Sequence, residues 1–441
     1  MKLTRLVVPV VFVLSSSMTL CGFPQTPTIS KLDRDRAQQM LKTVVDEVRK
    51  HYYDPKFHGV DLDKEFAEAK QRIEKVTTMN MALSNVANAL DSLDDSHTFF
   101  LPPSHPIKLD YGWQYQMVGD RCFVTQVRAG SDAAAKNVKP GDQVLAINGI
   151  APTREIIWKL QYMYTALRPQ PSLRVVLQDP AGTQRTIDVA AHIVETKRVT
   201  NLTMDGSSDI WSIIREMEAY DHYTRTRLAE YGDDLTVMRL AEFAYTPREV
   251  AELMGRVRKR KALILDLRGN PGGSVETLEF VAGDLFSKDV KIADRVGRKE
   301  RKPLVTRGSH DAFTGKLIVL VDSRSASAAE ILARLTQIEK RGVVIGDRSS
   351  GSVMEARHYS EQIGADTVVF YGVSITDADL IMSDGKSLEH VGVAPDEVIL
   401  PTAADLAANL DPVMAHAAEL AGVHISPADA GKMFPFEWPP Q

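Results

Sequence analysis

The feature that most constrains the fold of this chain is an apolar strand that runs directly into a glycine-rich turn. The strand is the sequence ILDL at residues 264–267, and the turn GNPGG follows at residues 269–273. Three glycines and a proline in five residues favour a tight turn whose backbone N–H groups can point toward one spot. The sequence therefore predicts an anion-binding loop at the end of a buried strand, of the kind that stabilises an oxyanion.

A second buried strand leads to a candidate nucleophile. Leu317–Val321 ends in the sequence DSRSASAAE, which places Ser323, Ser325 and Ser327 between a strand and a following helix. The N-terminus of that helix adds positive potential beside a serine at this junction. Ser323 and Ser325 are of a residue type that often caps a helix, so we expect those two to be structural.

Composition limits the class of protein. Of the 441 residues 44% are hydrophobic, enough to form the cores of two or three domains. The formal charge is -5, and the densest basic run, residues 256–261, leads straight into a strand, which argues against nucleic-acid binding. There is no HExxH motif, no cysteine cluster and no Lys-Ser/Thr pair of a phosphate-binding loop, so we expect no metal and no other cofactor.

The first residues have the layout of an export signal. Residues 1–22 carry Lys2 and Arg5, then an apolar stretch, then small polar residues, which predicts a secretory signal peptide and an exported protein of the periplasm or cell envelope. Lipidation of Cys21 is an alternative, and the chain would be held at a membrane only in that case. Once the signal is removed Cys122 is the only cysteine, so no intrachain disulfide can form.

The pattern of apolar residues divides the remaining chain into five segments. Helical periodicity comes first, then short strands with turn signals, then a polar stretch without clear alternation, then strands that alternate with helices, and last a tail with one alanine-rich helix. The expected bounds are 30–105 for the helical segment, 108–195 for the β-rich module, 196–234 for an insertion or linker, 235–402 for an α/β domain with a largely buried sheet, and 403–441 for the tail.

Several motifs in a fixed order resemble one known family. LDLRGNPGG, SASAAE and VVIGDRSSG follow KPGDQVLAINGI, and LEHVGVAPD closes the series at residues 388–396. This series resembles the carboxy-terminal processing (tail-specific) protease family, in its tricorn-core-like branch. The resemblance implies a multidomain α+β fold with a helical N-terminal segment, a PDZ β-module and an α/β, crotonase-like catalytic domain.

The resemblance also implies the roles of the catalytic residues. Ser327 would be the nucleophile, and the oxyanion hole would combine the N–H of Ala328 with one from the Gly272 and Gly273 turn. Better-known members use a lysine base, but here Ser352 stands in its place, and a neutral hydroxyl cannot deprotonate a serine.

A histidine elsewhere in the chain offers another base. Ser96 and His97, in DDSHTFF, resemble the Ser-His pair of the tricorn-like branch, which a glutamate completes. On this interpretation His97 is the general base, Ser96 hydrogen-bonds to His97, and Glu389 orients this Ser-His pair as the third member of a hydrogen-bonded relay. The rival acids are Glu330, Asp379 and Asp384, whereas we expect Asp266 and Arg268 to fix the glycine-rich loop rather than to react.

The stretch from Val138 to Ile150 is similar to the PDZ signature. In a PDZ module the N–H groups of Tyr111, Gly112 and Trp113 would hold a chain-terminal carboxylate while an extended peptide pairs with a sheet edge. The alternative is a structural β-module without a ligand.

Together these observations predict an exported serine endopeptidase that cleaves unfolded or tail-exposed polypeptides. The alternative from another class is a catalytically inactive PDZ-containing protein that binds peptides or other ligands on the same scaffold.

Overall fold

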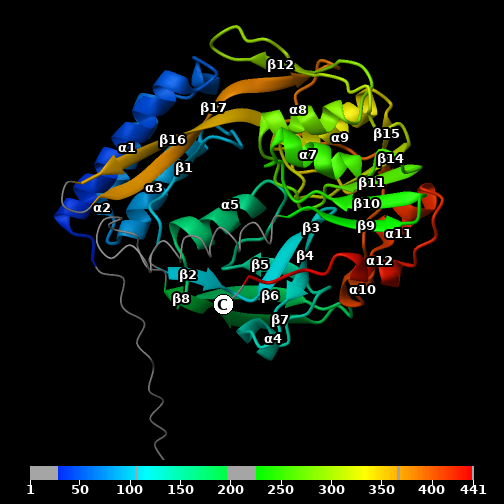
Figure 1. Cartoon of the computed structure of the whole chain (residues 1–441). Coiled ribbons are helices and arrows are strands. Elements are labelled where there is room, and N and C mark those ends of the chain that lie inside the picture. Colours follow the sequence, from blue (N-terminus) through cyan, green and yellow to red (C-terminus); the bar gives the residue numbers. More distant parts are fainter. Residues whose placement is uncertain (1–27, 106, 196–224, 365–367, 440–441) are drawn as a thin grey trace, which may run out of the picture.

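A computed structural model describes residues 28–105, 107–195, 225–364 and 368–439. The predicted signal peptide, Cys21 and most of the predicted 196–234 segment lie outside these residues. Helices with a long hairpin, a β-rich module and an α/β unit follow one another around the molecule (Figure 1). Within the described ranges, no helix has the length and hydrophobicity needed to cross a membrane.

Three helices form the N-terminal segment, and each begins at a residue whose side chain accepts a backbone N–H. They are α1 (Lys31–His51), α2 (Leu62–Lys75) and α3 (Met79–Asp91), with a short helix η1 (Phe57–Gly59) between the first two. Their buried side chains share one core with Tyr371, Val373 and Ile375 of strand β17 (Val369–Met382). The helical segment therefore packs on a strand that lies almost 300 residues later, and it is not a separate bundle.

The β-rich module is a five-stranded sheet in the order β3-β4-β5-β6-β7, here called the β-module. Its strands are β3 (Trp113–Val118), β4 (Arg121–Val127), β5 (Gln143–Ile147), β6 (Ser172–Gln178) and β7 (Gln184–Ala190). The short helix α4 (Asp132–Ala135), helix α5 (Ile157–Tyr162) and its continuation η2 (Met163–Leu167) complete it, and β2 (Ile107–Asp110) pairs with β8 (His192–Glu195) at its base. Cys122 is a buried free thiol in this core.

The α/β unit is built on a six-stranded sheet in the order β18-β15-β14-β11-β10-β9. All neighbours pair in parallel except β9, which is antiparallel to β10. The strands are β9 (Arg227–Tyr231), β10 (Leu235–Arg239), β11 (Ala262–Asp266), β14 (Lys316–Val321), β15 (Gly342–Gly346) and β18 (Glu397–Val398).

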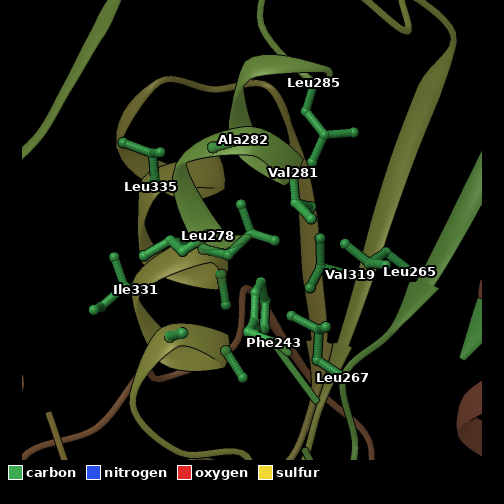
Figure 2. Close-up of a cluster of buried hydrophobic side chains, with 14 of the residues drawn as sticks. Phe243, Leu265, Leu267, Leu278, Val281, Ala282, Leu285, Val319, Ile331 and Leu335 are labelled. Atoms are coloured by element: carbon green, nitrogen blue, oxygen red, sulfur yellow. The ribbon is translucent and has the colours of Figure 1, made fainter. Parts of the chain in front are cut away.

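Helices cover both faces of this sheet. On β11, Leu263 and Leu265 pack toward α7 (Pro247–Gly255), α8 (Val275–Gly283) and α9 (Ala328–Ile338), and Figure 2 shows part of this cluster around Phe243. Ala262 and Ile264 pack on the opposite side against helices of the C-terminal segment. Because alternate side chains of a strand point to opposite faces, a strand buried on both sides must be apolar throughout, as ALIL is.

A second sheet joins the N-terminal helices to the α/β unit. Its order is β1-β17-β12-β13, and β16 also pairs with β17. The strands are β1 (Phe99–Leu101), β12 (Val290–Val296), β13 (Leu304–Thr306), β16 (Met354–Ile363) and β17. The expected α/β domain of residues 235–402 includes the apolar run TVVFYGV as one of its sheet strands; this expectation is wrong for β17, which pairs with β1, β12 and β16 and not with the six-stranded sheet.

Two further expectations need correction. Residues 227–231 are strand β9 of the α/β sheet and not part of a linker, because each residue pairs with β10 although the sequence lacks strand alternation. The tail contains three helices and not one: α10 (Ala403–Ala407), α11 (Pro412–Leu420) and α12 (Pro427–Met433). Asp411 and Ser426 each cap a new helix with proline at its first position, a signal that is visible in the sequence.

Candidate functional site

Ser327 lies where β14 gives way to α9. It is the residue directly before the helix, and its backbone has φ 53° and ψ -120°. A positive φ is strained for a residue with a side chain and persists only where the surroundings enforce it. A serine held in this way at a helix N-terminus is positioned to act as a nucleophile.

Ser96, His97 and Glu389 form a connected relay. The Ser96 Oγ lies 2.7 Å from His97 Nδ1 and 2.9 Å from Glu389 Oε2, and the Ser96 N–H donates to Glu389 Oε1 at 2.8 Å. Residues almost 300 positions apart thus meet in one chain of hydrogen bonds.

The direction of these bonds sets the tautomer of His97. A hydroxyl has one hydrogen, and an ionised carboxylate can only accept, so the Ser96 hydroxyl donates to Glu389. Nδ1 of His97 must then carry a hydrogen and donate it to Ser96 Oγ. The lone pair of the imidazole is consequently on Nε2, the nitrogen that can take up a proton.

One peptide unit links this relay to Ser327. The carbonyl oxygen of Ser352 accepts the Ser327 N–H at 2.9 Å, and the N–H of Val353, on the same peptide, donates to Glu389 Oε2 at 2.8 Å. Within the described residues no hydrogen bond joins His97 to Ser327 directly. Ser352 contributes its backbone, while its hydroxyl pairs with that of Ser350.

Burial sets the ionisation of the relay. It lowers the pKa of His97 below the ordinary 6.5, nearby His358 acts in the same direction, and Asp95 opposes both. His97 is therefore neutral, as a general base must be, at neutral pH. Burial also raises the pKa of Glu389, against the hydrogen bonds from Ser96 and Val353 that favour its ionised form.

The glycine-rich turn lies directly against Ser327. A Cβ on Gly272 would come within 2.6 Å of the Ser327 Cβ, and one on Gly273 within 2.4 Å of the Phe243 carbonyl oxygen, so both positions require glycine. The Gly272 N–H is occupied by Asn270 Oδ1 at 2.8 Å. Within the described chain the N–H groups of Gly273 and Ala328 have no acceptor, which makes them the available oxyanion donors.

Glu330 holds the loop in which Ser352 stands in place of the lysine base of better-known family members. Its Oε1 accepts the Ser349 hydroxyl at 2.6 Å and the Gly351 N–H at 2.7 Å, and its Oε2 accepts the N–H groups of Ser352 and Ser327 at 2.9 and 3.1 Å. Burial raises the pKa of Glu330 to about 7 although these four donors favour the carboxylate. Glu330 thus fixes the backbone of Ser327 and does not enter the relay.

The other candidate acids and serines are engaged elsewhere. Asp379 accepts the Ser387 hydroxyl, and Asp384 pairs with Arg334. The remaining contacts, all structural, are those of Ser323 Oγ with the Met117 carbonyl, Ser325 Oγ with the Leu267 carbonyl, and Arg268 with Asp266 and Asp411.

Asp95 is a site residue that the sequence analysis missed. Its Oδ1 accepts the N–H groups of His97 and Thr98 at 2.8 and 3.0 Å and the Thr376 hydroxyl at 2.7 Å. It ties the backbone of His97 to strand β17. An Asp two residues before a candidate base is a recognisable turn signal, but Thr376 becomes its partner only through the fold.

The predicted peptide-binding loop is largely occupied by the protein itself. The Gly112 N–H donates to Asp110 Oδ1 at 2.8 Å, the Tyr111 hydroxyl donates to the Gln170 carbonyl, and Trp113 is buried in the core of the β-module. Peptide binding by these residues stays a prediction, and it requires Gly112 to exchange Asp110 for a peptide group. Among the described residues, no group of His, Cys, Asp or Glu could hold a metal ion.

The chain is similar to known peptidases. Residues 234–399 match the family model of peptidase family S41, and residues 33–83 match the tricorn protease C1 domain. The carboxyl-terminal-processing protease of Synechocystis is 25% identical over 62% of this chain and 57% of its own length. The tail-specific protease of Haemophilus influenzae is 24% identical over 76% of this chain and 49% of its own. The chain thus spans about half the length of these two relatives.

The fold comparison covers more of the molecule. The crystal structure of mature CPAF superposes with a TM-score of 0.63 over 85% of this chain and 94% of that chain, at 14% identity, which shows a shared fold.

A serine at a strained strand-to-helix junction, an oxyanion turn and a histidine relay are the groups that a serine-type peptidase uses. Residues 234–399 form a peptidase family S41 domain, and the chain is a homologue of the C-terminal processing proteases.

The contacts of Glu330 predict a positioning role. In Glu330→Gln the amide NH₂ replaces one oxygen and then faces two of the four donors, so the loop and the Ser327 backbone must shift. We expect kcat to fall about 10- to 100-fold with a smaller change in KM, since misplacing a reacting group by an ångström costs about 10²-fold. The control is Glu339→Gln at the end of the same helix, where the side chain pairs with exposed Lys288. Equal kcat values for the two variants would exclude this role.

Proposed function

We propose that this protein is an exported serine endopeptidase that cleaves unfolded or tail-exposed polypeptides with Ser327 as nucleophile and His97 as base. The observation that carries the proposal is the single peptide of Ser352 and Val353, which binds Ser327 on one side and the Glu389 carboxylate on the other. This peptide connects the hydrogen-bonded group of Ser96, His97 and Glu389, in which the tautomer of His97 is fixed, to Ser327. Ser327 itself lies beside two N–H groups that have no acceptor among the described residues.

The chemistry follows from these positions. His97 Nε2 takes the Ser327 Oγ proton as the oxygen bonds to the substrate carbonyl carbon, and the carbonyl electron pair moves to the oxygen. The N–H groups of Gly273 and Ala328 stabilise that oxyanion. His97 then gives the proton to the leaving amine as the C–N bond breaks, and water, deprotonated by His97, releases the acyl group in the same way.

His97 and Ser327 must approach each other for the first step. No direct hydrogen bond joins them in the described structure, and catalytic hydrogen bonds often tighten only in the substrate complex. Since the two residues belong to different parts of the fold, a bound polypeptide that contacts both parts would bring them together.

Labelling with a fluorophosphonate tests this proposal directly. The reagent forms a covalent adduct only with an activated serine, so the intact protein should be modified once, at Ser327, as peptide mapping by mass spectrometry can show. A protein that binds peptides yet remains unlabelled would instead be the non-catalytic binding protein that the sequence also allows.

Export is tested separately. If residues 1–22 direct secretion, the protein recovered from the envelope of an export-competent bacterial host should have lost them, which intact mass measurement detects. Recovery of the complete chain in the cytoplasm alone would contradict export without affecting the peptidase proposal.

The lowered pKa of His97 predicts where activity is lost in acid. The base works only when neutral, and a lowered pKa keeps it neutral to lower pH, so the acid limb of kcat/KM should lie below pH 6.5. In His358→Gln the neighbour that lowers the pKa of His97 is removed, so the acid limb should move upward. Profiles from about pH 4.5 to 9 measure both effects. His310→Gln is the control, because that side chain is fully exposed. A wild-type limb above 6.5 would contradict the burial argument.

A further inference from the structure

A large cavity separates the β-module from the α/β unit. Its volume is about 1090 Å³, and one wall consists of Gln114 and Gln116 on strand β3. The opposite wall is the edge at which the parallel strands end, with Arg239 at the end of β10 and Asp322 just after β14. Ligands of open α/β sheets bind at this carboxyl edge.

The acidic side chains that line this cavity already have partners. Asp322 accepts the Gly269 N–H at 2.9 Å, and Asp347 pairs with Arg154 at 2.6 Å. The other contacts are those of Asp411 with Arg268 and of Glu437 with Arg225, and Glu242 is not free either.

Two arginines in the cavity lack such partners. Within the described residues, the side chains of half-buried Arg239 and of exposed Arg324 make neither a hydrogen bond nor an ion pair. Asp266 is the register partner of Arg239 across the sheet, but the Arg268 side chain donates to both oxygens of that carboxylate. A guanidinium carries five hydrogen-bond donors and keeps its positive charge, so these two side chains can bind an anion in the cavity.

The chain sets an upper limit on the distance between Arg239 and the reacting serine. The chain runs from Arg239 to Phe243, whose N–H donates to the Gly272 carbonyl at 2.7 Å, and Gly272 lies against Ser327. Four residues of extended chain span at most about 14 Å. The two contacts that follow add a few ångströms, so an extended substrate would reach Arg239 within about six residues of the bond that Ser327 attacks.

We propose that Arg239, assisted by Arg324, is a specificity-determining site that binds a carboxylate of the polypeptide substrate within about six residues of the cleaved bond. The inference rests on the proposed peptidase function and adds that the peptidase prefers substrates with a carboxylate at this place. The carboxylate belongs to an Asp or Glu side chain or to the end of the substrate chain, and both present the same two oxygens to a guanidinium.

Matched peptides test the preference with the full-length enzyme. A peptide that the enzyme cleaves in casein is resynthesised with Glu or Gln at each position up to about six residues from the bond on either side, each with a free or an amidated end. We expect the wild type to prefer one carboxylate-bearing form about 10-fold in kcat/KM, as a charge-assisted hydrogen bond would give. A difference between Glu and Gln identifies a side chain, and a difference between acid and amide identifies the chain end.

The variants locate the preference. In Arg239→Gln it should disappear while the uncharged peptide is cleaved as before, and in Arg239→Lys part of it should remain. Arg248→Gln is the control, because Arg248 is exposed on α7 and pairs only with Glu252. Equal kcat/KM values for all peptides with the wild type would overturn the proposal even if Arg239→Gln failed to fold. A wild type that cleaves nothing and resists fluorophosphonate would instead refute the proposed function.

Discussion

Ser327→Ala is expected to lower peptide hydrolysis by at least about 10⁴-fold, since removing the nucleophile of a serine protease costs on the order of 10⁶ in kcat. The alanine keeps the backbone, so the hydrogen bonds of the Ser327 N–H to Ser352 and Glu330 can persist. The fold should therefore be unchanged. Hydrolysis of casein or of a quenched fluorescent peptide measures the effect, and far-UV circular dichroism checks the structure.

Ser323→Ala is the matched control for this prediction. Ser323 lies on the same loop, but its hydroxyl donates to the Met117 carbonyl in the β-module and does not face the relay. Its activity should stay within about threefold of the wild type, because one hydrogen bond contributes about 1 kcal/mol to stability and none to the chemical step. If Ser327→Ala retains wild-type turnover, another residue attacks the substrate.

His97→Ala is expected to cause a loss of about 10⁴-fold or more in kcat, comparable to the loss of the nucleophile, because members of a catalytic unit act together. The physical reason is the fixed tautomer: with Nδ1–H donating to Ser96, only Nε2 of His97 can take up the Ser327 proton. In Ser96→Ala the imidazole loses this constraint and its link to Glu389, so a smaller reduction is expected. Initial rates at saturating peptide concentration separate these effects from binding.

Ser352→Ala distinguishes the two possible bases. Ser352 stands where relatives of this family are expected to have lysine, but its hydroxyl pairs with Ser350 and only its backbone reaches the site. Alanine preserves that backbone, so activity should remain near the wild-type level. The opposite pattern, an inactive Ser352→Ala and an active His97→Ala, would show that His97 is not the base.

The local sequence determined the parts of the site that lie within one segment. The strand ending in GNPGG and the serine before α9 follow from apolar runs, glycine and helix capping, which act over a few residues. The positive φ of Gly272 and Gly273 is a local property of the turn as well. The three N-terminal helices and the strands of the β-module follow from periodicity for the same reason.

The predictions that failed depended on contacts between distant residues. β9 lacks strand alternation, and it is a strand because β10 offers it an edge. The sequence of β17 is typical of another strand of the α/β sheet, but its apolar residues Tyr371, Val373 and Ile375 complete the core of the N-terminal helices. Local propensity cannot decide between two sheets, because strand preference reflects the surface against which a strand packs.

Sequence alone therefore determined the candidate chemistry: a serine, an oxyanion turn, and a histidine that a resemblance made a candidate base. Only the tertiary structure decided which groups connect. It selected Glu389 over Glu330, Asp379 and Asp384, gave Glu330 the task of holding the Ser327 loop, and left Gly273 rather than Gly272 with an available N–H. The physical reason is that a hydrogen bond requires its partners within about 3 Å, and only the packing of β17 between the helices and the α/β unit brings residues 96 and 389 that close.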